Sequence, residues 1–302
     1  MLHRDENFVP PHTDWRTGIL LSCSESDENT GLCVVRCAEA GVAFDTLATP
    51  TTWLREALQS PLQARFLQLF QSVHATTQLP FLTAANIATW SDGLTHLPVD
   101  ICPVNGVVAA IRRLVGEIRT EPLRVFVTHA FERRDVTGAF WTMSASARYH
   151  HTGAGGLALH TSEVAQDIAG QTSLRDLERD LGIAGALLHD IGKIWSYTPD
   201  MFLNAAGLAM GHELLGLSRL ESELGALEQA WPDGAYTMRA LLSGQSRMRD
   251  NRTMPTSLLA RIKACDQRSC EQYRATRFAK HTHKPVWVPQ PWEDDFAMDM
   301  PY

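Results

Sequence analysis

The sequence lacks the features that mark membrane-spanning, secreted and repetitive proteins. No run of apolar residues approaches the roughly 18 that a membrane helix needs, and the first fifteen residues contain no apolar signal core. Internal repeats and low-complexity tracts are also absent, so neither a solenoid nor a long coiled coil is expected. These absences predict a cytoplasmic protein that does not associate with membranes.

Cysteines are few, and none is placed as in a zinc ribbon or a redox motif. The chain has six, and no two of them form a C-x-x-C pair. Cys33 and Cys37 are close in sequence, as are Cys265 and Cys270, but each pair stands alone. This arrangement predicts reduced thiols rather than disulfides or a zinc site.

The charge is predominantly acidic but unevenly spread. The net charge is −7, yet residues 238–284 hold 11 Lys and Arg against 3 Asp and Glu, a local balance of +8. The rest of the chain has 27−11 = 16 basic and 34−3 = 31 acidic residues, a balance of −15. A basic block in an acidic protein suits a phosphate-rich partner such as nucleic acid, and a solvated helix face is the equally weighted alternative.

The apolar content of 44% in 302 residues is enough for one large or two modest cores. Residues 1–50 contain GILLSCS, GLCVVRC and VAFDTLAT, which favour paired strands in a small β subdomain. Residues 51–104 are expected to form a helical connecting region, with one helix after Thr51 or Thr52 and a second after Ser60-Pro61, over LQARFLQLFQSV.

Residues 105–284 show apolar positions at three-and-four spacing and predict a helical domain. Residues 285–302 contain four prolines without periodicity and predict an irregular tail. The expected fold class is therefore mostly α, with a small N-terminal region of possible β structure.

His160 and the pair His189-Asp190 stand out within the helical region. His160 shares a predicted helical stripe with Leu157 and Val164, so its imidazole faces the interior. Taken alone, it would be interpreted as a hydrogen-bonded core histidine. His189 also faces inward, and Asp190 follows it in an otherwise apolar helix. A buried carboxylate there requires a cation or a proton to compensate its charge.

Asp266 supplies a second inward carboxylate, because it lies on one helical face with Leu259 and Ile262. Two imidazoles and two carboxylates offer the nitrogen and oxygen ligands that suit Zn, Mn, Fe or Mg. A single His-Asp dipeptide would be weak evidence. The complete ordered set, with GGL before it and GK after it, is a much more specific signal.

With these motifs the chain resembles the HD-domain superfamily of metal-dependent phosphohydrolases. The resemblance runs from about residue 107 to 270 and is nearest in style to the HD domain of MobH-type conjugative relaxases (the TraI_2 type) and to YhaM-like 3′–5′ exonucleases. The resemblance rests on four segments, SASARYHHTGAGGLALHTSEVA, AGALLHDIGK, AMGHELLG and ACDQRSCEQ. It implies an HD-domain helical bundle.

The resemblance also implies roles for individual residues. His160, His189, Asp190 and Asp266 would bind a divalent metal, and Asp190 would bridge two ions if two were bound. His212 would bind or border the second ion. The residues implied for the substrate side are His150, His151 and Lys193, with Lys193 holding a phosphate.

Two departures from those families are visible. The chain reads LLSGQSRM where dinuclear relatives carry a further histidine pair, and only His150 and His151 follow Tyr149 where the relaxase type has three histidines. Tyr149 or a histidine is conceivable as a covalent nucleophile, with packing or substrate contact as the simpler role.

The basic residues beyond the motif are expected to follow a nucleic-acid backbone. They are Arg247, Arg249, Arg252, Arg261, Lys263, Arg268, Arg274 and Arg277. The leading hypothesis is a metal-dependent phosphodiesterase or nuclease acting on single-stranded DNA or RNA, with Asp190 and Lys193 in its catalytic centre. The resemblance suggests conjugation or a mobile element as its setting. A nucleotide phosphohydrolase and a non-catalytic nucleic-acid-binding protein with a structural metal are the alternatives.

Overall fold

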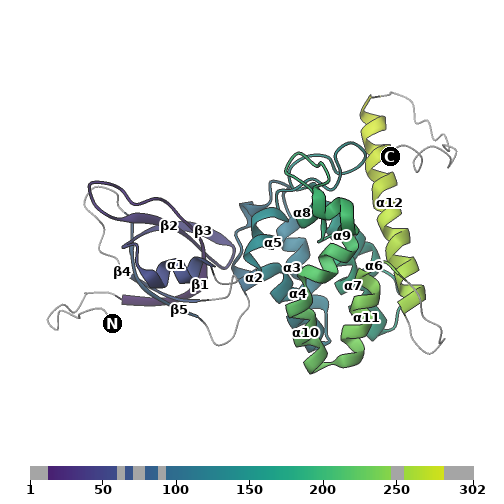
Figure 1. Ribbon diagram of the computed structural model, residues 1–302, viewed down its shortest axis with the longest axis horizontal. Coiled ribbons are helices and arrows are strands. Elements are labelled where there is room, and N and C mark those ends of the chain that lie inside the picture. Colours follow the sequence, from purple (N-terminus) through teal and green to yellow (C-terminus); the bar gives the residue numbers. More distant parts are fainter. Residues whose placement is uncertain (1–12, 60–64, 71–78, 88–92, 246–254, 282–302) are drawn as a thin grey trace.

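The computed structural model describes residues 13–59, 65–70, 79–87, 93–245 and 255–281. Figure 1 shows a β-barrel at one end of the molecule and a larger helical body at the other. The elements, in chain order, are β1 (Thr13–Cys23), β2 (Cys33–Glu39), β3 (Val42–Ala48), α1 (Thr52–Gln59), β4 (Arg65–Phe70), β5 (Phe81–Ile87), α2 (Gly93–His96), a 3₁₀ turn (Val99–Ile101), α3 (Val107–Glu117), α4 (Glu121–Glu132), α5 (Arg134–Ala139), α6 (Gly156–Ala169), α7 (Asp176–Leu188), α8 (Lys193–Ser196), α9 (Ala205–Arg219), α10 (Glu221–Ala230), α11 (Pro232–Leu242) and α12 (Pro255–His281).

The five strands close into a barrel in the order β1-β2-β3-β5-β4. β1 pairs antiparallel with β2 and with β4, whereas β3 and β5 run parallel. Along β2, the buried residues Cys33, Val35 and Cys37 alternate with the more exposed Val34 and Arg36, as the period of a strand requires. The three strands predicted before residue 50 and the helix predicted after Thr51 are confirmed.

The prediction that residues 51–104 form a helical connection is wrong, because β4 and β5 lie in this range and complete the barrel. Of the helix predicted over LQARFLQLFQSV, the described part is strand β4. Its segment RFLQLF is short and mostly apolar, so periodicity alone does not separate helix from strand. Pairing with β1 on one side and β5 on the other decides the conformation.

The barrel is joined to the helical body by a shared core and a half-buried arginine. Ile19 and Ala38 of the barrel belong to the same apolar cluster as α3, α4 and α5. The guanidinium of Arg134 donates to the carbonyl of Leu20 at 2.7 Å and to that of Ala57 at 3.1 Å. These bonds fasten the start of α5 to β1 and α1.

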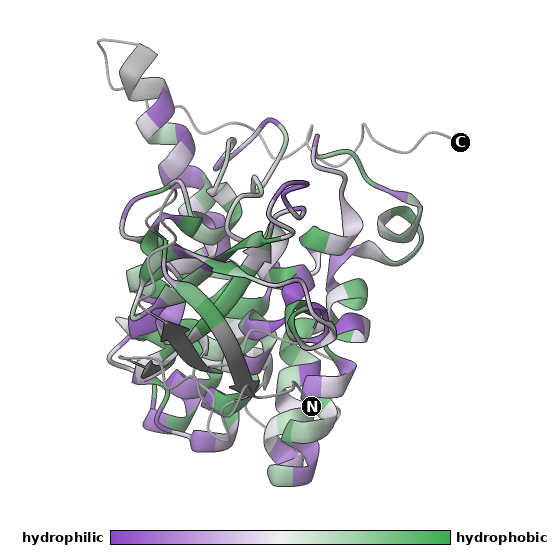
Figure 2. Cartoon of the chain, turned by 90° about the vertical axis from the view of Figure 1, so that its left-hand side faces the viewer, coloured by the Kyte–Doolittle hydropathy of each residue, from purple (hydrophilic) through white to green (hydrophobic). Residues whose placement is uncertain are grey.

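The helical body predicted for residues 105–284 is present from α3 onward. Its core is one apolar cluster to which α3, α4, α6, α7, α11 and α12 contribute. Figure 2, seen from the barrel end, shows the hydrophilic residues mainly on the outer parts of the helices. No described helix combines the length and apolar character of a membrane span. The tail 285–302 and Arg247, Arg249 and Arg252 lie outside the described residues.

Candidate metal centre

Two glycines shape the start of α6 and the loop that precedes it. Gly155 adopts the left-handed conformation (φ 80°) directly before the helix, and a Cβ on Gly156 would lie 1.8 Å from the carbonyl oxygen of His151. Only glycine permits this close approach. The loop therefore packs onto the first turn of α6, with the rings of His150 and His151 each centred 5.1 Å from that of His160.

The His189-Asp190 pair lies in the turn between α7 and α8, just past the end of the predicted helix. His189 caps α7, and its Nδ1 lies 2.7 Å from the carbonyl oxygen of Ala186. Gly192 follows in the same turn, and a Cβ there would lie 1.8 Å from the carbonyl oxygen of His212. The close approach of α9 therefore explains the glycine of the GK motif. The same approach brings the side chain of His212 to Asp190.

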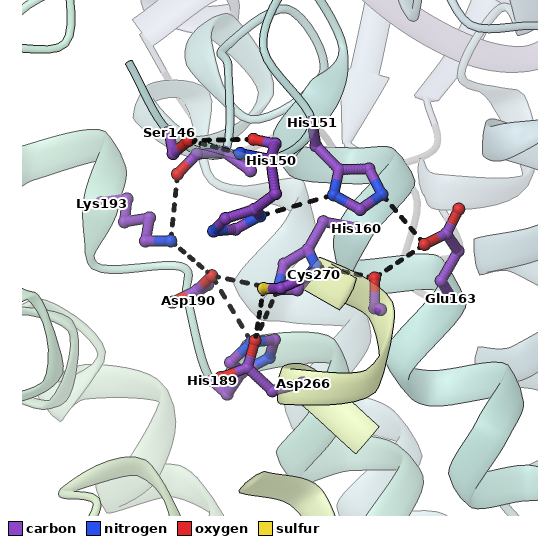
Figure 3. Close-up of polar contacts among 12 residues, drawn as sticks. Ser146, His150, His151, His160, Glu163, His189, Asp190, Lys193, Asp266 and Cys270 are labelled. Atoms are coloured by element: carbon purple, nitrogen blue, oxygen red, sulfur yellow. Dashed lines mark hydrogen bonds and ion pairs between the residues drawn. The ribbon is translucent and has the colours of Figure 1, made fainter. Parts of the chain in front are cut away.

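Asp266 lies on α12 among buried residues of one helical face, including Ile262 and Ser269. Its side chain is 40% exposed, so it closes the cluster from the solvent side. Figure 3 shows Asp266 beside His189, with His160 and Asp190 close by. The structure therefore brings together the four residues that the sequence motifs singled out.

Three distances within this quartet fit ligands of a shared cation, and Asp266 joins the group through His160. Nε2 of His160 lies 3.1 Å from Oδ1 of Asp266 and 3.5 Å from Oδ2 of Asp190, and Nε2 of His189 lies 3.4 Å from the same Oδ2. Ligands about 2.1 Å from a common ion are roughly 3.0–3.4 Å apart at octahedral or tetrahedral angles. The ligand atoms of His160, His189 and Asp190 all lie within 4.8 Å of one another.

The buried imidazole nitrogens give a second indication. His160 is 0% exposed, and the Nε2 atoms of His160 and His189 have no aligned hydrogen-bond partner among the described residues. Such atoms are costly to bury unless something binds them. Burial lowers the pKa of His160, and this effect outweighs the two carboxylates, which would raise it. The low pKa favours the neutral imidazole that a metal requires.

Asp190 is the most strongly compensated group of the cluster. Its Oδ2 accepts from Nζ of Lys193 at 2.7 Å, and its Oδ1 lies 3.2 Å from Nε2 of His212. Burial would raise the pKa of this carboxyl, but Lys193, His189 and His212 outweigh burial and hold it well below its usual value. Burial would lower the pKa values of Lys193 and His212, and Asp190 reverses the effect and raises both.

A chain of hydrogen bonds leads away from His160. Its Nδ1 lies 3.0 Å from Oγ of Ser269, which donates to Oε2 of Glu163 at 2.7 Å. Because the single hydroxyl proton goes to Glu163, Ser269 accepts from Nδ1–H, and Nε2 of His160 is left with its lone pair facing the cluster. Glu163 also lies 2.9 Å from Nε2 of His151, whose Nδ1 is 3.4 Å from His150.

The cluster opens into a cavity of about 230 Å³. Its polar lining comes from His150, His189, Asp190, Lys193, His212, Glu213, Lys263 and Asp266. Two larger cavities, of about 360 and 350 Å³, lie at the barrel junction and beside α3 and α4. Among the described residues, no group of His, Cys or carboxylate ligands within ligand distance lines either of them.

Two residues predicted for the substrate side lie elsewhere. His151 is 2% exposed, has φ 46°, and serves the hydrogen-bond chain instead of lining the cavity. Arg268 is exposed and pairs with Asp167 at 3.6 Å, outside the cavity. Of the others, His150 and Lys193 line the cavity, and Nζ of Lys193 is held in place by the carbonyl oxygen of Ala145 at 3.0 Å.

Three residues of the site were not singled out from the sequence. Ser269 and Cys270 follow Asp266 by three and four positions, and Glu163 follows His160 by three. These offsets place each of them one helical turn beyond a ligand, on the same face. A search one turn along from each candidate ligand would have found all three.

The chain was compared with protein-family models and with curated proteins. No protein-family model matches the chain, and no curated protein is significantly similar to it. The geometry of the cluster, together with the order of the motifs, is therefore what supports an assignment.

Proposed function

We propose that this protein is a metal-dependent phosphohydrolase of the HD type, acting on phosphodiesters of nucleic acid. The observation that carries the proposal is the convergence of His160, His189, Asp190 and Asp266 at ligand-like separations around two buried imidazole nitrogens that have no aligned hydrogen-bond partner among the described residues. A divalent ion held by these four would lower the pKa of a bound water and neutralise charge on the phosphoryl oxygens. One or two ions of Zn, Mn, Fe or Mg suit the donor set.

The remaining residues of the cavity are arranged to bind and orient a phosphate. Lys193 keeps a positive charge beside the cluster because Asp190 raises its pKa. His212 has a raised pKa and faces the second oxygen of Asp190, which is where a proton donor or a ligand of a second ion would be placed. His150 is neutral at pH 7, since burial lowers its pKa to about 4, so it adds no charge beside Lys193.

The surroundings of the cavity favour a chain-like substrate. A space of about 230 Å³ accommodates a phosphate and part of a sugar, so the rest of the substrate would lie outside. Next to His150, the ring of Tyr149 is exposed and lies 5.5 Å from the guanidinium of Arg274. An exposed aromatic ring beside an arginine is the pattern that stacks unpaired bases.

The barrel supports the same substrate class. The OB fold is also a small five-stranded β-barrel, and its members bind oligonucleotides. A nuclease of a conjugation or mobile-element system would fit this combination of modules, and the motif resemblance points to that setting.

The test is hydrolysis of labelled single-stranded DNA, single-stranded RNA and a panel of free nucleotides by the metal-free protein supplied with Mn²⁺, Mg²⁺, Zn²⁺ or Fe²⁺. We expect cleavage of a single-stranded substrate and a loss of at least ~10³-fold in kcat for Asp190→Asn, the scale of removing a central charge-stabilising group. Asp180→Asn is the matched control, because Asp180 is also buried on α7, but it lies more than two turns before His189, accepts hydrogen bonds from Thr120 and does not line the cavity.

Release of phosphate from free nucleotides with no cleavage of nucleic acid would replace the nuclease by a nucleotide phosphohydrolase. Protein that binds metal and nucleic acid but hydrolyses neither substrate would show the site to be structural.

A further inference from the structure

Two donors outside the quartet face the same position in the cavity. Cys270 lies one turn after Asp266 on α12, and its Sγ is 3.7 Å from Oδ1 of Asp266. His150 lies in the loop before α6. The ligand atoms of His150, His160 and Cys270 lie within 4.8 Å of one another, and Figure 3 shows Cys270 next to His160 and Asp190.

The buried nitrogen of His160 links these donors to the quartet. His160 belongs to both ligand groups, with His189 and Asp190 in one and with His150 and Cys270 in the other. Its Nδ1 is engaged by Ser269, so the fully buried Nε2, which has no aligned partner among the described residues, is the nitrogen available to both. A cation at this nitrogen would therefore be within reach of the thiol and of the second imidazole.

The position of Cys270 differs from that of a cysteine used for packing. Cys265, on the preceding turn of the same helix, lies in the apolar core and accepts a hydrogen bond from Gln171 at 3.3 Å. Cys270 instead lines the cavity with Asp266 and Lys193. The backbone of His150 is held beside the cavity by Ser146. The Oγ of Ser146 accepts from the backbone N–H of His150 and donates to its carbonyl oxygen, both at 3.0 Å.

We propose that Cys270 and His150 are additional ligands of this centre, which makes it a mixed nitrogen, oxygen and sulfur site. The inference rests on the metal centre of the proposed function and specifies which ions it selects. Thiolate and imidazole ligands favour Zn²⁺, Co²⁺ or Fe²⁺ over Mg²⁺ and Mn²⁺. The sulfur–metal bond forms as the thiol proton leaves to water, and no electron is transferred.

The test is a titration of Co²⁺ into the full-length metal-free protein, followed by absorption spectroscopy. We expect a thiolate-to-cobalt charge-transfer band in the near ultraviolet for the wild type and for the control Cys265→Ser, and no such band for Cys270→Ser. His150→Asn should shift the visible ligand-field bands. In a competition experiment, the ratio of the affinities for Zn²⁺ and Mg²⁺ should be at least about tenfold smaller for Cys270→Ser than for the wild type. Tenfold is the lower end of the loss of affinity expected when the surroundings of a metal are perturbed.

The possible failures are distinguishable. Cobalt bound by the wild type without a thiolate band, or a band that persists in Cys270→Ser, would overturn the inference and leave the metal centre standing. Absence of any bound Co²⁺, Zn²⁺ or Mn²⁺ would remove the metal centre itself. Circular dichroism checks that each variant is folded, and Cys270→Ala replaces Cys270→Ser if the serine variant is not.

Discussion

The barrel and the helical body bury polar groups to very different extents. Among the described residues of the barrel, Thr46 is the one buried polar side chain, and its hydroxyl donates to the carbonyl of Pro80 at 2.8 Å. The buried polar residues of the helical body are Thr128, Glu132, His151, His160, Thr161, Ser162, Asp180, Asp190, Ser196 and Ser269. Because burying polar and charged groups opposes folding unless they are paired, the helical body carries the larger cost, and His160 and Asp190 of the candidate metal centre are part of it.

The two bodies also differ in charge. The described strands, loops and helix of the barrel, residues 13–59 and 65–87 without 71–78, hold 7 acidic and 4 basic residues, a balance of 4−7 = −3. Helix α12 holds 6 basic and 2 acidic residues, a balance of 6−2 = +4. The loop between β1 and β2 includes Glu25, Asp27 and Glu28. Electrostatic attraction of nucleic acid is therefore expected along α12 more than at this loop.

The largest effect is expected where the buried network supports a ligand. Glu163→Gln weakens the acceptor of the Ser269 hydroxyl, so Ser269 is no longer held as the acceptor that fixes the tautomer of His160. We expect metal affinity to fall ~10–100-fold, as for other outer-shell partners. Asp167→Asn is the control, since Asp167 is one turn further along α6 and pairs with exposed Arg268. Equal affinities for both variants, measured by calorimetry, would show that the buried network does not serve the metal.

Next in size is the effect of filling the contact between α8 and α9. A Cβ at Gly192 meets backbone atoms of His212 and Gly216, so Gly192→Ala should cost about 1–3 kcal/mol in the free energy of unfolding, as overpacking does. In α10, nothing lies within 4 Å of the position that a Cβ on Gly225 would occupy, and Gly225→Ala should be neutral or stabilising by up to ~1 kcal/mol. Urea unfolding measures both, and a Gly192→Ala variant as stable as the wild type would contradict the close approach.

A smaller effect concerns pH. The pKa of His150 is lowered by burial to about 4 in the folded metal-free protein, while an unfolded histidine has a pKa of ~6.5. Between these values the unfolded chain binds the proton and the folded chain does not, so acidification from pH 6.5 to 4 favours unfolding. His212 has a raised pKa and contributes in the opposite sense, with stability present below pH ~6.5 and lost as the pH rises through its folded value.

The contribution of His150 is isolated by comparing the wild type with His150→Gln across this range. The variant should show a shallower loss of melting temperature on acidification. Parallel curves would mean that the His150 ring is protonated as easily in the folded protein as in the unfolded chain.

The smallest expected effect tests the charge difference directly. Arg274→Ala should weaken binding of single-stranded DNA modestly and reduce the slope of log affinity against log salt by roughly 1, or slightly less for single strands. Arg55→Ala, an exposed arginine on α1 of the barrel, should leave the slope unchanged. If Arg55→Ala had the larger effect in a filter-binding assay, the barrel would be the main nucleic-acid surface.

Much of the site was predictable because its ligands follow regular periodicities. His160 lies within an apolar helical stripe that is readable from the sequence, Asp266 lies beside such a stripe and is partly exposed, and His189-Asp190 interrupts an apolar run. The convergence of these three segments was expected from the motif order, and the distances among them agree with it.

The rest depends on contacts that sequence periodicity does not encode. Arg65–Phe70 is a strand because it pairs with β1 and β5, and neither partner adjoins it in the sequence. Ser269 meets His160 and Glu163 across more than 100 positions. His151 forms a hydrogen bond with Glu163 and does not line the cavity, and no local sequence pattern reveals this contact. Tertiary context decides each of these cases.

Helix α12 has a consequence for the timing of assembly. It provides Asp266, Ser269 and Cys270 and packs against α6 and α7, whose other partners precede it in the chain. During synthesis the earlier helices can fold first. A chain still bound to the ribosome would then have His160, His189 and Asp190 in place but not Asp266. The candidate metal centre would then be complete only when α12 docks, so any activity that depends on Asp266 would begin after the other helices have folded.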